Sequence, residues 1–303
     1  MADVVVVGSL SMDFTAIAPR LPQLGETVLG DEFLMVPGGK GNNQALAAAR
    51  QGASIAMIGC IGADSLGDAI IDVVRAERID PSSVIRDATH DTGIAQIMVD
   101  ANGDNVIVVV PRANHALDAA RVGAQRHLIA EAKVLLVQLE IPLDAVAAAL
   151  GHARAAGVTT ILNPAPASSL PDDLLALVDI CVPNETEAES LTTRTVDDPD
   201  AAVEAGRALL ARGVGAALVT LGSRGAVYVD ADRRIDVAPF EVAAIDATAA
   251  GDAFCGALAA SLAADDTMEA ALRRASAAGA LATTVRGASP SLPDAADVDA
   301  LVR

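Results

Sequence analysis

Four short polar or glycine-rich segments carry the residues that could do chemistry, and the first spans residues 38–44. It reads Gly-Gly-Lys-Gly-Asn-Asn-Gln and precedes an alanine-rich stretch of helical length. Glycines let a backbone approach a small ligand closely, and Lys40, Asn42 and Asn43 supply hydrogen-bond donors and acceptors of the kind that bind a polyol. Lys40 is one of only two lysines in a chain that otherwise uses arginine, which indicates a need for a compact ammonium here. A glycine-rich turn that only caps a helix is the alternative.

The second segment, residues 246–252, reads Asp-Ala-Thr-Ala-Ala-Gly-Asp and runs into an apolar helix. Small residues at a helix start leave backbone N–H groups free, and with the helix dipole these form an anion site without a cationic side chain. Asp252 falls in the first helical turn. Its carboxylate could cap the helix, or it could take a proton from a hydroxyl that attacks a bound phosphoryl group.

The third and fourth segments each follow a predicted strand. Residues 184–187 read Asn-Glu-Thr-Glu, and residues 220–225 read Thr-Leu-Gly-Ser-Arg-Gly. α/β proteins bind ligands beyond the carboxyl ends of their strands. An acidic first turn of a helix is the alternative for the third segment. Because all four segments lie at strand ends or helix starts, we expect them to form one site.

The elements that must position these segments alternate along the chain. Short β-branched runs without polar alternation are typical of strands buried on both faces of a parallel sheet. Alanine-rich stretches of helical length separate them, which predicts a doubly wound, mainly parallel α/β sheet flanked by helices. The expected strands are residues 4–7, 54–58, 134–139, 158–162, 180–182 and 216–221, and the expected helices are 42–50, 143–156, 201–212, 251–262, 268–284 and a short one from about 294.

Two stretches break the alternation. Residues 14–36 have no helical period, and residues 92–110 indicate a hairpin whose arms, 93–99 and 105–110, join around Asn102-Gly103, a type I′ turn signal. We expect these stretches to pair as one small antiparallel sheet, a lid on a single domain that spans residues 1–303. Two unrelated surface excursions are the alternative.

Composition excludes several classes of protein. The net charge is −19, from 40 acidic and 21 basic residues, which disfavours nucleic acid and anionic membranes as partners. No P-loop or dinucleotide-binding fingerprint is present. The chain starts without a basic segment and has no apolar run of about 18 residues. Three scattered cysteines, Cys60, Cys181 and Cys255, indicate free buried thiols, so we expect a cytoplasmic protein.

In order along the chain, four motifs resemble those of the ribokinase-like carbohydrate kinases. They are Gly39-Lys40-Gly41, Asn184-x-x-Glu187, Gly222-Ser223-Arg224-Gly225 and Ala250-Gly251-Asp252. The stretches 163–167, 170–179 and 183–189 extend the resemblance, which covers residues 8–291 and is strongest to the ribose-specific members. The resemblance implies ATP-dependent phosphorylation of the 5-hydroxyl of D-ribose to ribose 5-phosphate. A kinase of the same family for 2-deoxyribose, another small sugar or a nucleoside is the alternative.

The resemblance also implies roles for individual residues. Asp252 is the implied general base, and the amides of Ala249, Ala250 and Gly251 are the implied anion hole. The implied sugar contacts are Ser11, Asp13, Gly39, Lys40, Gly41, Asn42, Asn43, Glu140 and Asp252. The implied ATP contacts are Asn184, Glu187, Thr220, Leu221, Gly222, Ser223, Arg224, Gly225, Gly251 and Ser276, with Glu187 linked to Mg²⁺. A monovalent cation, usually K⁺, is implied at Asp246, Thr248, Ala282, Val285, Gly287 and Ser291, and the lid is the implied homodimer interface.

Three residues depart from the family pattern. Ser11, followed by Met12, stands where an asparagine usually touches the sugar, and the shorter side chain leaves ribose and 2-deoxyribose both open. Ser276 stands where a histidine often lies against the adenine. Ala63 replaces the first aspartate of a Gly-Asp-Asp turn, and we have no functional account of it.

Overall fold

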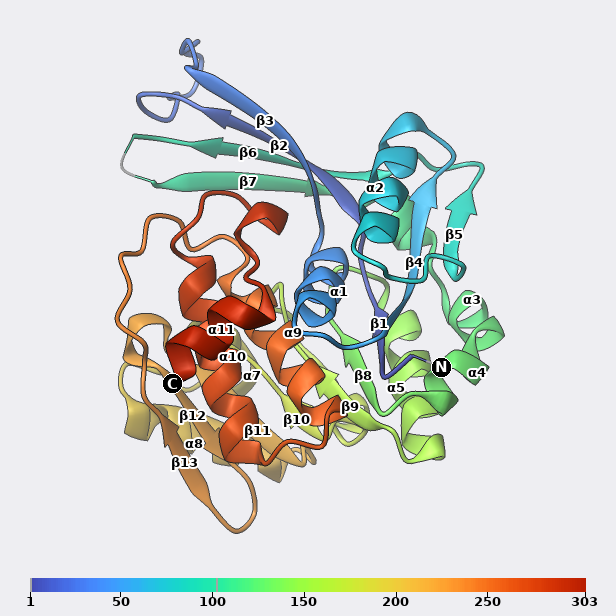
Figure 1. Cartoon of the computed structure of the whole chain (residues 1–303), viewed down its shortest axis with the longest axis vertical. Coiled ribbons are helices and arrows are strands. Elements are labelled where there is room, and N and C mark those ends of the chain that lie inside the picture. The colour runs from blue at the N-terminus through green and yellow to red at the C-terminus, as the bar shows by residue number, and fades with distance from the viewer. Residues whose placement is uncertain (1, 102) are drawn as a thin grey trace.

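The computed structural model describes residues 2–101 and 103–303, and its centre is a large sheet of nine strands in these residues (Figure 1). The strands from β11 to β5 run parallel, and β12 and β13 add an antiparallel edge. In spatial order they are β13 (Arg234–Val237), β12 (Ala226–Val229), β11 (Ala216–Thr220), β10 (Ile180–Cys181), β9 (Thr159–Leu162), β8 (Val134–Val137), β1 (Val4–Val7), β4 (Ile55–Gly62) and β5 (Val84–Asp87).

Helices cover both faces of this sheet. Successive side chains of a strand point to opposite faces, so Val4 and Val6 pack into one hydrophobic core, and Val5 and Val7 into the other. The first core lies under α1 (Lys40–Arg50), α2 (Ser65–Ala76), α9 (Ala250–Ala263), α10 (Met268–Ala282) and α11 (Ala295–Val302). The second lies under α3 (Ala119–Ala124), α4 (Arg126–Glu131), α5 (Leu143–Ala156) and α6 (Asp172–Leu175), and α7 (Glu185–Thr192) and α8 (Pro199–Ala211) cover β11 and β12.

The predicted doubly wound fold is confirmed, and most predicted elements differ from the structure only at their ends. β4 is the largest difference, because it continues past Ile58 to Gly62. Glycines are typical of strand ends, but here Gly59 and Gly62 stay extended and pair with β5, which the hydrophobic pattern did not reveal. No helix in the part of the chain that the structure describes is long and apolar enough to cross a membrane.

A second, four-stranded sheet stands off the large one. Its strands, in spatial order, are β3 (Glu32–Gly38), β2 (Ser11–Ile17), β6 (Gly93–Val99) and β7 (Asn105–Val110). The two irregular stretches therefore pair with each other, as expected. Two of the three ladders are antiparallel, but the central pair, β2 and β6, is parallel because no hairpin joins these two strands. Gly103 has a φ of 88°, whereas Asn102, on which the type I′ prediction rests, lies outside the described residues.

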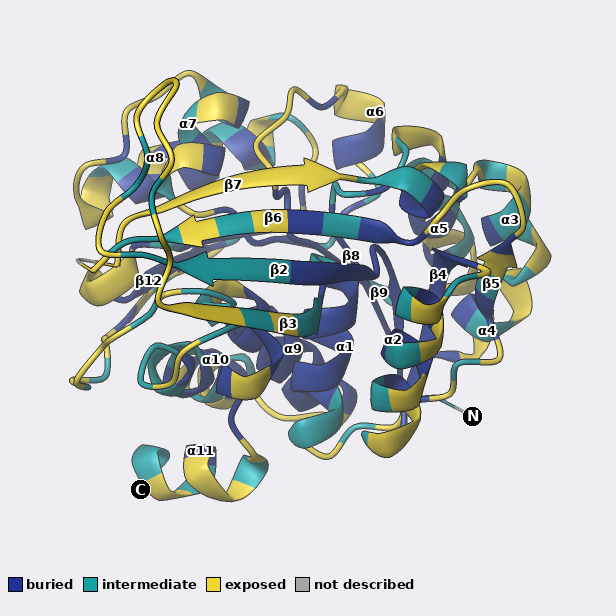
Figure 2. Ribbon diagram, turned by 90° about the horizontal axis from the view of Figure 1, so that it is seen from above, coloured by how far each residue is buried: buried dark blue, intermediate teal, exposed yellow. Residues whose placement is uncertain are grey.

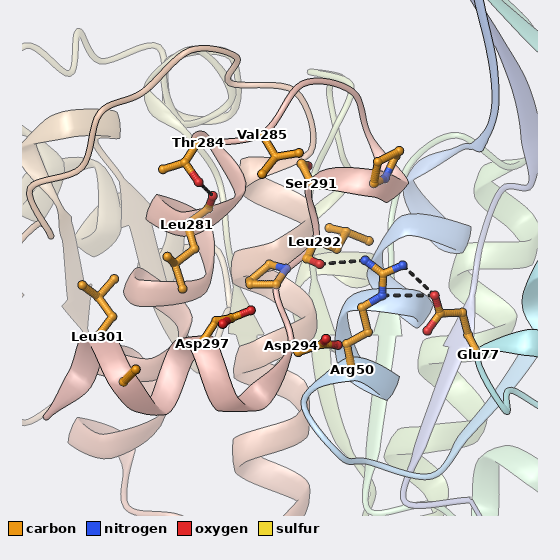
Figure 3. Close-up of a pocket in the computed structure, with 13 residues that line it drawn as sticks. Arg50, Glu77, Leu281, Thr284, Val285, Ser291, Leu292, Asp294, Asp297 and Leu301 are labelled. Carbon is orange, nitrogen blue, oxygen red and sulfur yellow. Dashed lines mark hydrogen bonds and ion pairs between the residues drawn. The ribbon is translucent and has the colours of Figure 1, made fainter.

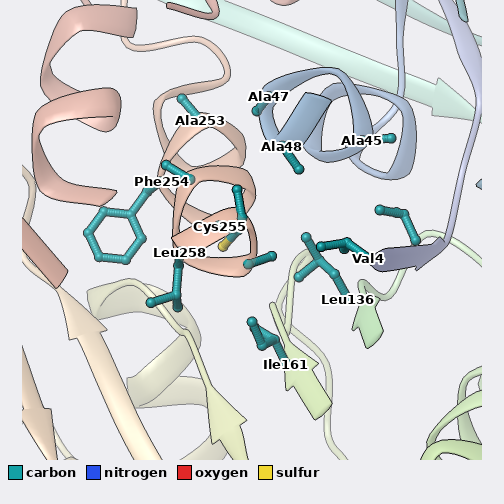
Figure 4. Close-up of a cluster of buried hydrophobic side chains, with 14 of the residues drawn as sticks. Val4, Ala45, Ala47, Ala48, Leu136, Ile161, Ala253, Phe254, Cys255 and Leu258 are labelled. Carbon is teal, nitrogen blue, oxygen red and sulfur yellow. The ribbon is translucent and has the colours of Figure 1, made fainter. Parts of the chain in front are cut away.

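The two helices whose N-termini carry the candidate site pack unusually closely. A Cβ added at Gly256 of α9 would lie 2.4 Å from the Ala47 Cβ and 2.8 Å from the Gln44 carbonyl oxygen of α1. Figure 4 shows Ala47 and Ala48 of α1 on the side of that helix toward α9, above the strands. This close approach brings the N-terminal segment of α1 against the first turn of α9.

Replacing Gly256 by alanine is expected to separate these helices. Overpacking a dense interface costs about 1–3 kcal/mol, so we expect a lower melting temperature in a thermal unfolding experiment and a lower kcat. Gly151→Ala in α5 is the matched control, because an added Cβ there meets nothing within 4 Å and alanine favours a helix over glycine. Equal melting temperatures for the two variants would contradict this account of the interface.

Candidate active site

A cavity of about 180 Å³ lies where the carboxyl ends of three parallel strands meet the start of α9. Asn163 follows β9, Asn184 lies just beyond β10, and Thr220 ends β11. The cavity collects parts of all four segments that the sequence singled out. Its lining is Lys40, Asn163, Ala165, Val182, Asn184, Glu187, Thr220, Ala247, Ala249, Gly251, Asp252 and Cys255.

Asp252 lies at the junction of α1 and α9 and is only 6% exposed. Its Oδ2 accepts a hydrogen bond from Asn43 Nδ2 (3.1 Å), and its Oδ1 accepts one from Gln44 Nε2 (2.9 Å). Burial raises its pKa, and the nearby Lys40 ammonium and the two amide donors oppose that rise. The capping alternative is not realised, because no side chain caps α9. A buried carboxylate of raised pKa suits a general base.

The backbone at the start of α9 is shaped to leave donors free. Ala249 has a φ of 60°, in the left-handed region that alanine rarely adopts, and such strain is typical of functional sites. The Gly251 N–H makes no hydrogen bond with any described residue, and an added Cβ there meets nothing within 4 Å. The Ala250 N–H instead donates to the Ala247 carbonyl (3.2 Å), so this donor is only partly available to the expected anion hole.

Lys40 is the cation of this site. Burial alone would lower the pKa of its ammonium, but the carboxylates of Asp252, Glu140 and Glu187 lie close enough to raise it above its usual value. The Lys40 backbone N–H donates to Glu140 Oε2 (2.9 Å), which also accepts from the Ser9 hydroxyl (2.5 Å). Lys40 therefore stays charged in spite of its burial.

Asp13 is a buried carboxylate that lacks a protein donor. It is 7% exposed, and no described residue donates a hydrogen bond to its side chain. Burial, with Glu140 and Asp252 nearby, raises its pKa to about 7. Its oxygens lie so near Gly38 that an added Cβ there would come within 2.1–2.4 Å of the carboxylate. A buried acceptor without a partner is costly, so we expect ligand hydroxyls to supply the missing donors.

The other expected sugar contacts surround these groups. Gly39 has a φ of 87°, and a Cβ at Gly41 would lie 2.6 Å from the Gly8 carbonyl carbon, so both positions require glycine. Asn42 is buried with neither side-chain polar atom hydrogen-bonded, and Asn43 Oδ1 is likewise unpartnered.

The expected ATP contacts are only partly brought together. Asn184 and Glu187 form a capping box at the start of α7, so the helix-start alternative is realised, and yet both line the cavity. Thr220 adjoins Asn184 through an isolated bridge. Six expected ATP contacts do not line the cavity: Leu221, Gly222, Ser223, Arg224, Gly225 and Ser276. Leu221 is in the core, Arg224 forms an ion pair with Glu185, and the Ser276 hydroxyl donates to the Ala238 carbonyl.

The segments of the expected monovalent-cation site do lie together. Asp246 Oδ1 accepts from the Thr248 backbone N–H (2.9 Å) and hydroxyl (2.6 Å), and Oδ2 accepts from the Gly287 N–H (2.8 Å). Burial opposes ionisation, but these hydrogen bonds hold the pKa of Asp246 below its usual value. The carbonyl oxygens of Thr248, Val285 and Gly287 accept no hydrogen bond from the described residues. An ionised carboxylate and unpaired carbonyls fit a hard cation such as K⁺.

Sequence reasoning assigned no role to three amides that organise the centre. Gln138 Nε2 donates to Gln44 Oε1 (2.6 Å), and Gln44 Nε2 is shared between Asp252 and Asn163 Oδ1 (3.1 Å). Gln138 and Asn163 follow β8 and β9 directly, so their position beyond strand ends was the available signal. The chain of amides holds the Asp252 carboxylate from the sheet side.

A larger cavity, of about 920 Å³, lies elsewhere, between the end of α1 and α10 and α11 (Figure 3). Its main polar feature is Arg50, which pairs with Glu77 (2.6 Å) and donates to the carbonyls of Ser289 and Leu292. Val285 and Ser291 of the expected cation segment line it, but none of the expected sugar or ATP contacts does.

Comparison with known proteins places this geometry in a family. The family model "pfkB family carbohydrate kinase" matches residues 1–295. The chain is 40% identical to a ribokinase of Haemophilus influenzae, over 95% of this chain and 94% of that one, and 33% identical to a deoxyribokinase of Salmonella typhi, over 96% and 95%. A structure of Arabidopsis thaliana ribokinase complexed with ribose and ATP superposes with a TM-score of 0.93 at 30% identity, covering 100% and 99%. The chain belongs to the pfkB family of carbohydrate kinases.

Proposed function

We propose that this protein is an ATP-dependent sugar kinase that transfers a phosphoryl group to the 5-hydroxyl of D-ribose. Near full-length similarity to ribokinases supports this substrate and the use of ATP. The single observation that carries the proposal is the buried Asp252 carboxylate, held by two amides of α1 beside the free N–H of Gly251. A base and an anion site close to each other are what phosphoryl transfer requires.

In the cavity and beside it, each of these groups then has a task. Asp252 takes the proton of the attacking hydroxyl. The amides at the start of α9 and the Lys40 ammonium stabilise the charge that develops on the transferred phosphoryl group. Asp13, with its unpaired oxygens, orients the sugar by accepting hydrogen bonds from its hydroxyls.

Two ions complete the proposal. Among the described residues, no three carboxylate, histidine or cysteine side chains cluster as a metal cage, which fits a Mg²⁺ held mainly by phosphate oxygens and water. Glu187, which lines the cavity, is the carboxylate that would face it. Mg²⁺ would neutralise phosphate charge. K⁺ would be held by Asp246 and the carbonyls beside it, close to the start of α9.

The small sheet is proposed as a lid and as a homodimer interface. Its edge strand β7 exposes Val106, Ile107, Val108, Val109 and Val110 (Figure 2). Unpaired, apolar edge strands invite pairing with another chain. Sedimentation of the protein is expected to show a dimer that a Val108→Asp substitution dissociates.

The free, buried thiols of Cys60, Cys181 and Cys255 support a cytoplasmic location.

A substrate panel tests the function. We expect coupled ADP release to be fastest with D-ribose, slower with 2-deoxyribose, fructose and adenosine, and stimulated by K⁺ over Na⁺. A preference for 2-deoxyribose would favour the second candidate, which the similarity to a deoxyribokinase and the short Ser11 side chain support. Activity only with a nucleoside would overturn the proposed substrate and keep the class of enzyme.

A further inference from the structure

Asn114 lies under the strand that carries Ser11 and Asp13, and no step proposed above uses it. It belongs to a short 3₁₀ helix, Arg112–Ala116, that follows β7, and it is 1% exposed. Its Oδ1 accepts from the Leu10 N–H (2.9 Å), and its Nδ2 donates to the Leu10 carbonyl (2.9 Å) and to Ser11 Oγ (3.1 Å). All the hydrogens of this amide are therefore used.

The hydrogen bond from Asn114 determines whether the Ser11 hydroxyl can donate or accept a further hydrogen bond. Because Ser11 Oγ accepts from Asn114, its own hydrogen is left to donate. No described residue accepts that hydrogen, although Ser11 is only 3% exposed. A buried donor without an acceptor is costly, so we expect a ligand oxygen to accept this hydrogen.

The Ser11 hydroxyl lies on the same side of the strand as the Asp13 carboxylate. Ser11 and Asp13 are two residues apart in β2, so their side chains point to the same face, about 7 Å apart along the strand. Ser9, again two residues earlier in the chain, donates to Glu140 near Lys40. The strand therefore offers one donor, Ser11, and one acceptor, Asp13, over a distance that a single pentose spans.

The surroundings hold this pair rigidly. A Cβ added at Gly93, the first residue of β6, would lie 2.5 Å from Asn114 Nδ2 and 2.9 Å from Ser11 Oγ. Ser11 and Gly93 are paired in the small sheet. The amide can therefore neither rotate away nor admit a longer neighbour without moving the base of that sheet.

From this geometry we propose that Asn114 is a positioning residue that sets sugar specificity, by fixing the Ser11 hydroxyl as a hydrogen-bond donor to one oxygen of the sugar. The proposal rests on the sugar-binding function proposed above. It explains how a serine acts where a longer amide is usual in the family: its hydroxyl is oriented by a buried partner. The recognised feature is an acceptor oxygen, so a sugar that has hydrogen in its place is disfavoured.

A double-mutant cycle measured by calorimetric titration of ribose at pH 8 without nucleotide tests the proposal. Ser11→Ala removes the donor, and Asn114→Asp keeps the shape but replaces the donating amide by an acceptor, so that the serine hydrogen turns inward. Each is expected to weaken ribose binding about fivefold to tenfold. Both substitutions act on the same hydrogen bond. The ribose affinity of the double variant is therefore expected to be at most about twofold lower than that of the single variant with the lower affinity. Ser168→Asp, on an exposed loop outside the small sheet, is the charge control.

Losses that multiply in the double variant, or unchanged binding in either single variant, would overturn the inference while leaving the proposed function intact. Failure of the unsubstituted protein to bind any pentose would overturn both.

If Asn114→Asp does not fold, a second measurement decides. Ribose analogues with one hydroxyl replaced by fluorine, which still accepts, are compared with those carrying hydrogen. At one position of the sugar, the analogue with fluorine is expected to bind more tightly than the analogue with hydrogen. The Ser11→Ala substitution is expected to abolish that difference. Equal binding of every pair would contradict the donor role.

Discussion

Replacing Asp252 by alanine is expected to lower kcat at least about a hundredfold, the usual contribution of a general base, while sugar and ATP still bind. The residual rate comes from the amides at the start of α9 and from Lys40, which the substitution leaves in place. Coupled ADP release measures kcat, and calorimetric titration measures binding of each substrate separately. A loss confined to kcat identifies a group that acts in the transition state.

The control for Asp252 comes from the opposite end of the same helix. Asp266 follows α9, is exposed and forms no ion pair with a described residue, so Asp266→Asn is expected to leave kcat unchanged. Full activity of Asp252→Ala would mean that another group takes the proton. Loss of the fold is tested by thermal unfolding, because in the variant Asn43 loses its acceptor and Gln44 keeps only Asn163.

Replacing Asp13 by asparagine is expected to have two opposite effects. Ribose affinity falls about a hundredfold, since charge-assisted hydrogen bonds to hydroxyls contribute about 1.5–3 kcal/mol each. The unliganded protein becomes more stable at pH 8, because the substitution removes a buried charge that lacks a donor. Calorimetric titration and thermal unfolding of the same samples measure the two effects.

The pH dependence of this gain follows from the raised pKa. In the folded protein Asp13 releases its proton near pH 7, whereas in the unfolded chain it does so near 3.8. The unfolded chain therefore binds fewer protons between these values, and folding stability falls as pH rises through this window. The gain from Asp13→Asn, on the order of a few kcal/mol at pH 8, is expected to shrink toward pH 4. Asp31→Asn, on an exposed loop, is the control. A variant less stable than the parent at pH 8 would contradict the assignment.

The acidic composition and a phosphate ligand are compatible in this structure. Of the 21 cationic residues in the chain, Lys40 is the one that lines the candidate cavity, with Asp252 and Glu187 also in its walls. Backbone amides at the start of α9 supply the remaining positive potential, and they act only over a short range. Surface carboxylates beyond about 10 Å are screened at ordinary salt. The net charge of −19 therefore describes the surface and not the site.

Local chemistry explains why the large sheet was predictable. Val4–Val7 is buried on both faces, which only a parallel sheet with helices on either side provides, and its ends match the prediction. The predicted helix 143–156 likewise matches α5, because an αL glycine follows it. By contrast, β5 and the edge strand β13 include charged residues and carry no such continuous apolar run, so their pairing depends on neighbours that the sequence does not display.

The sequence by itself determined the chemical content of the site: the glycine-rich start of α1, the small residues before Asp252, and the polar residues that follow strands. Their types and local positions follow from backbone conformation and helix-end chemistry, which act within a few residues. Only the tertiary structure decided which groups meet. The pairing of Asp252 with Asn43 and Gln44 spans more than 200 residues and depends on the close packing at Gly256. The raised pKa of Asp13 and the direction of the Ser11 hydrogen bond are likewise properties of burial and of distant partners, because desolvation and hydrogen bonding depend on the folded surroundings and not on neighbours in the chain.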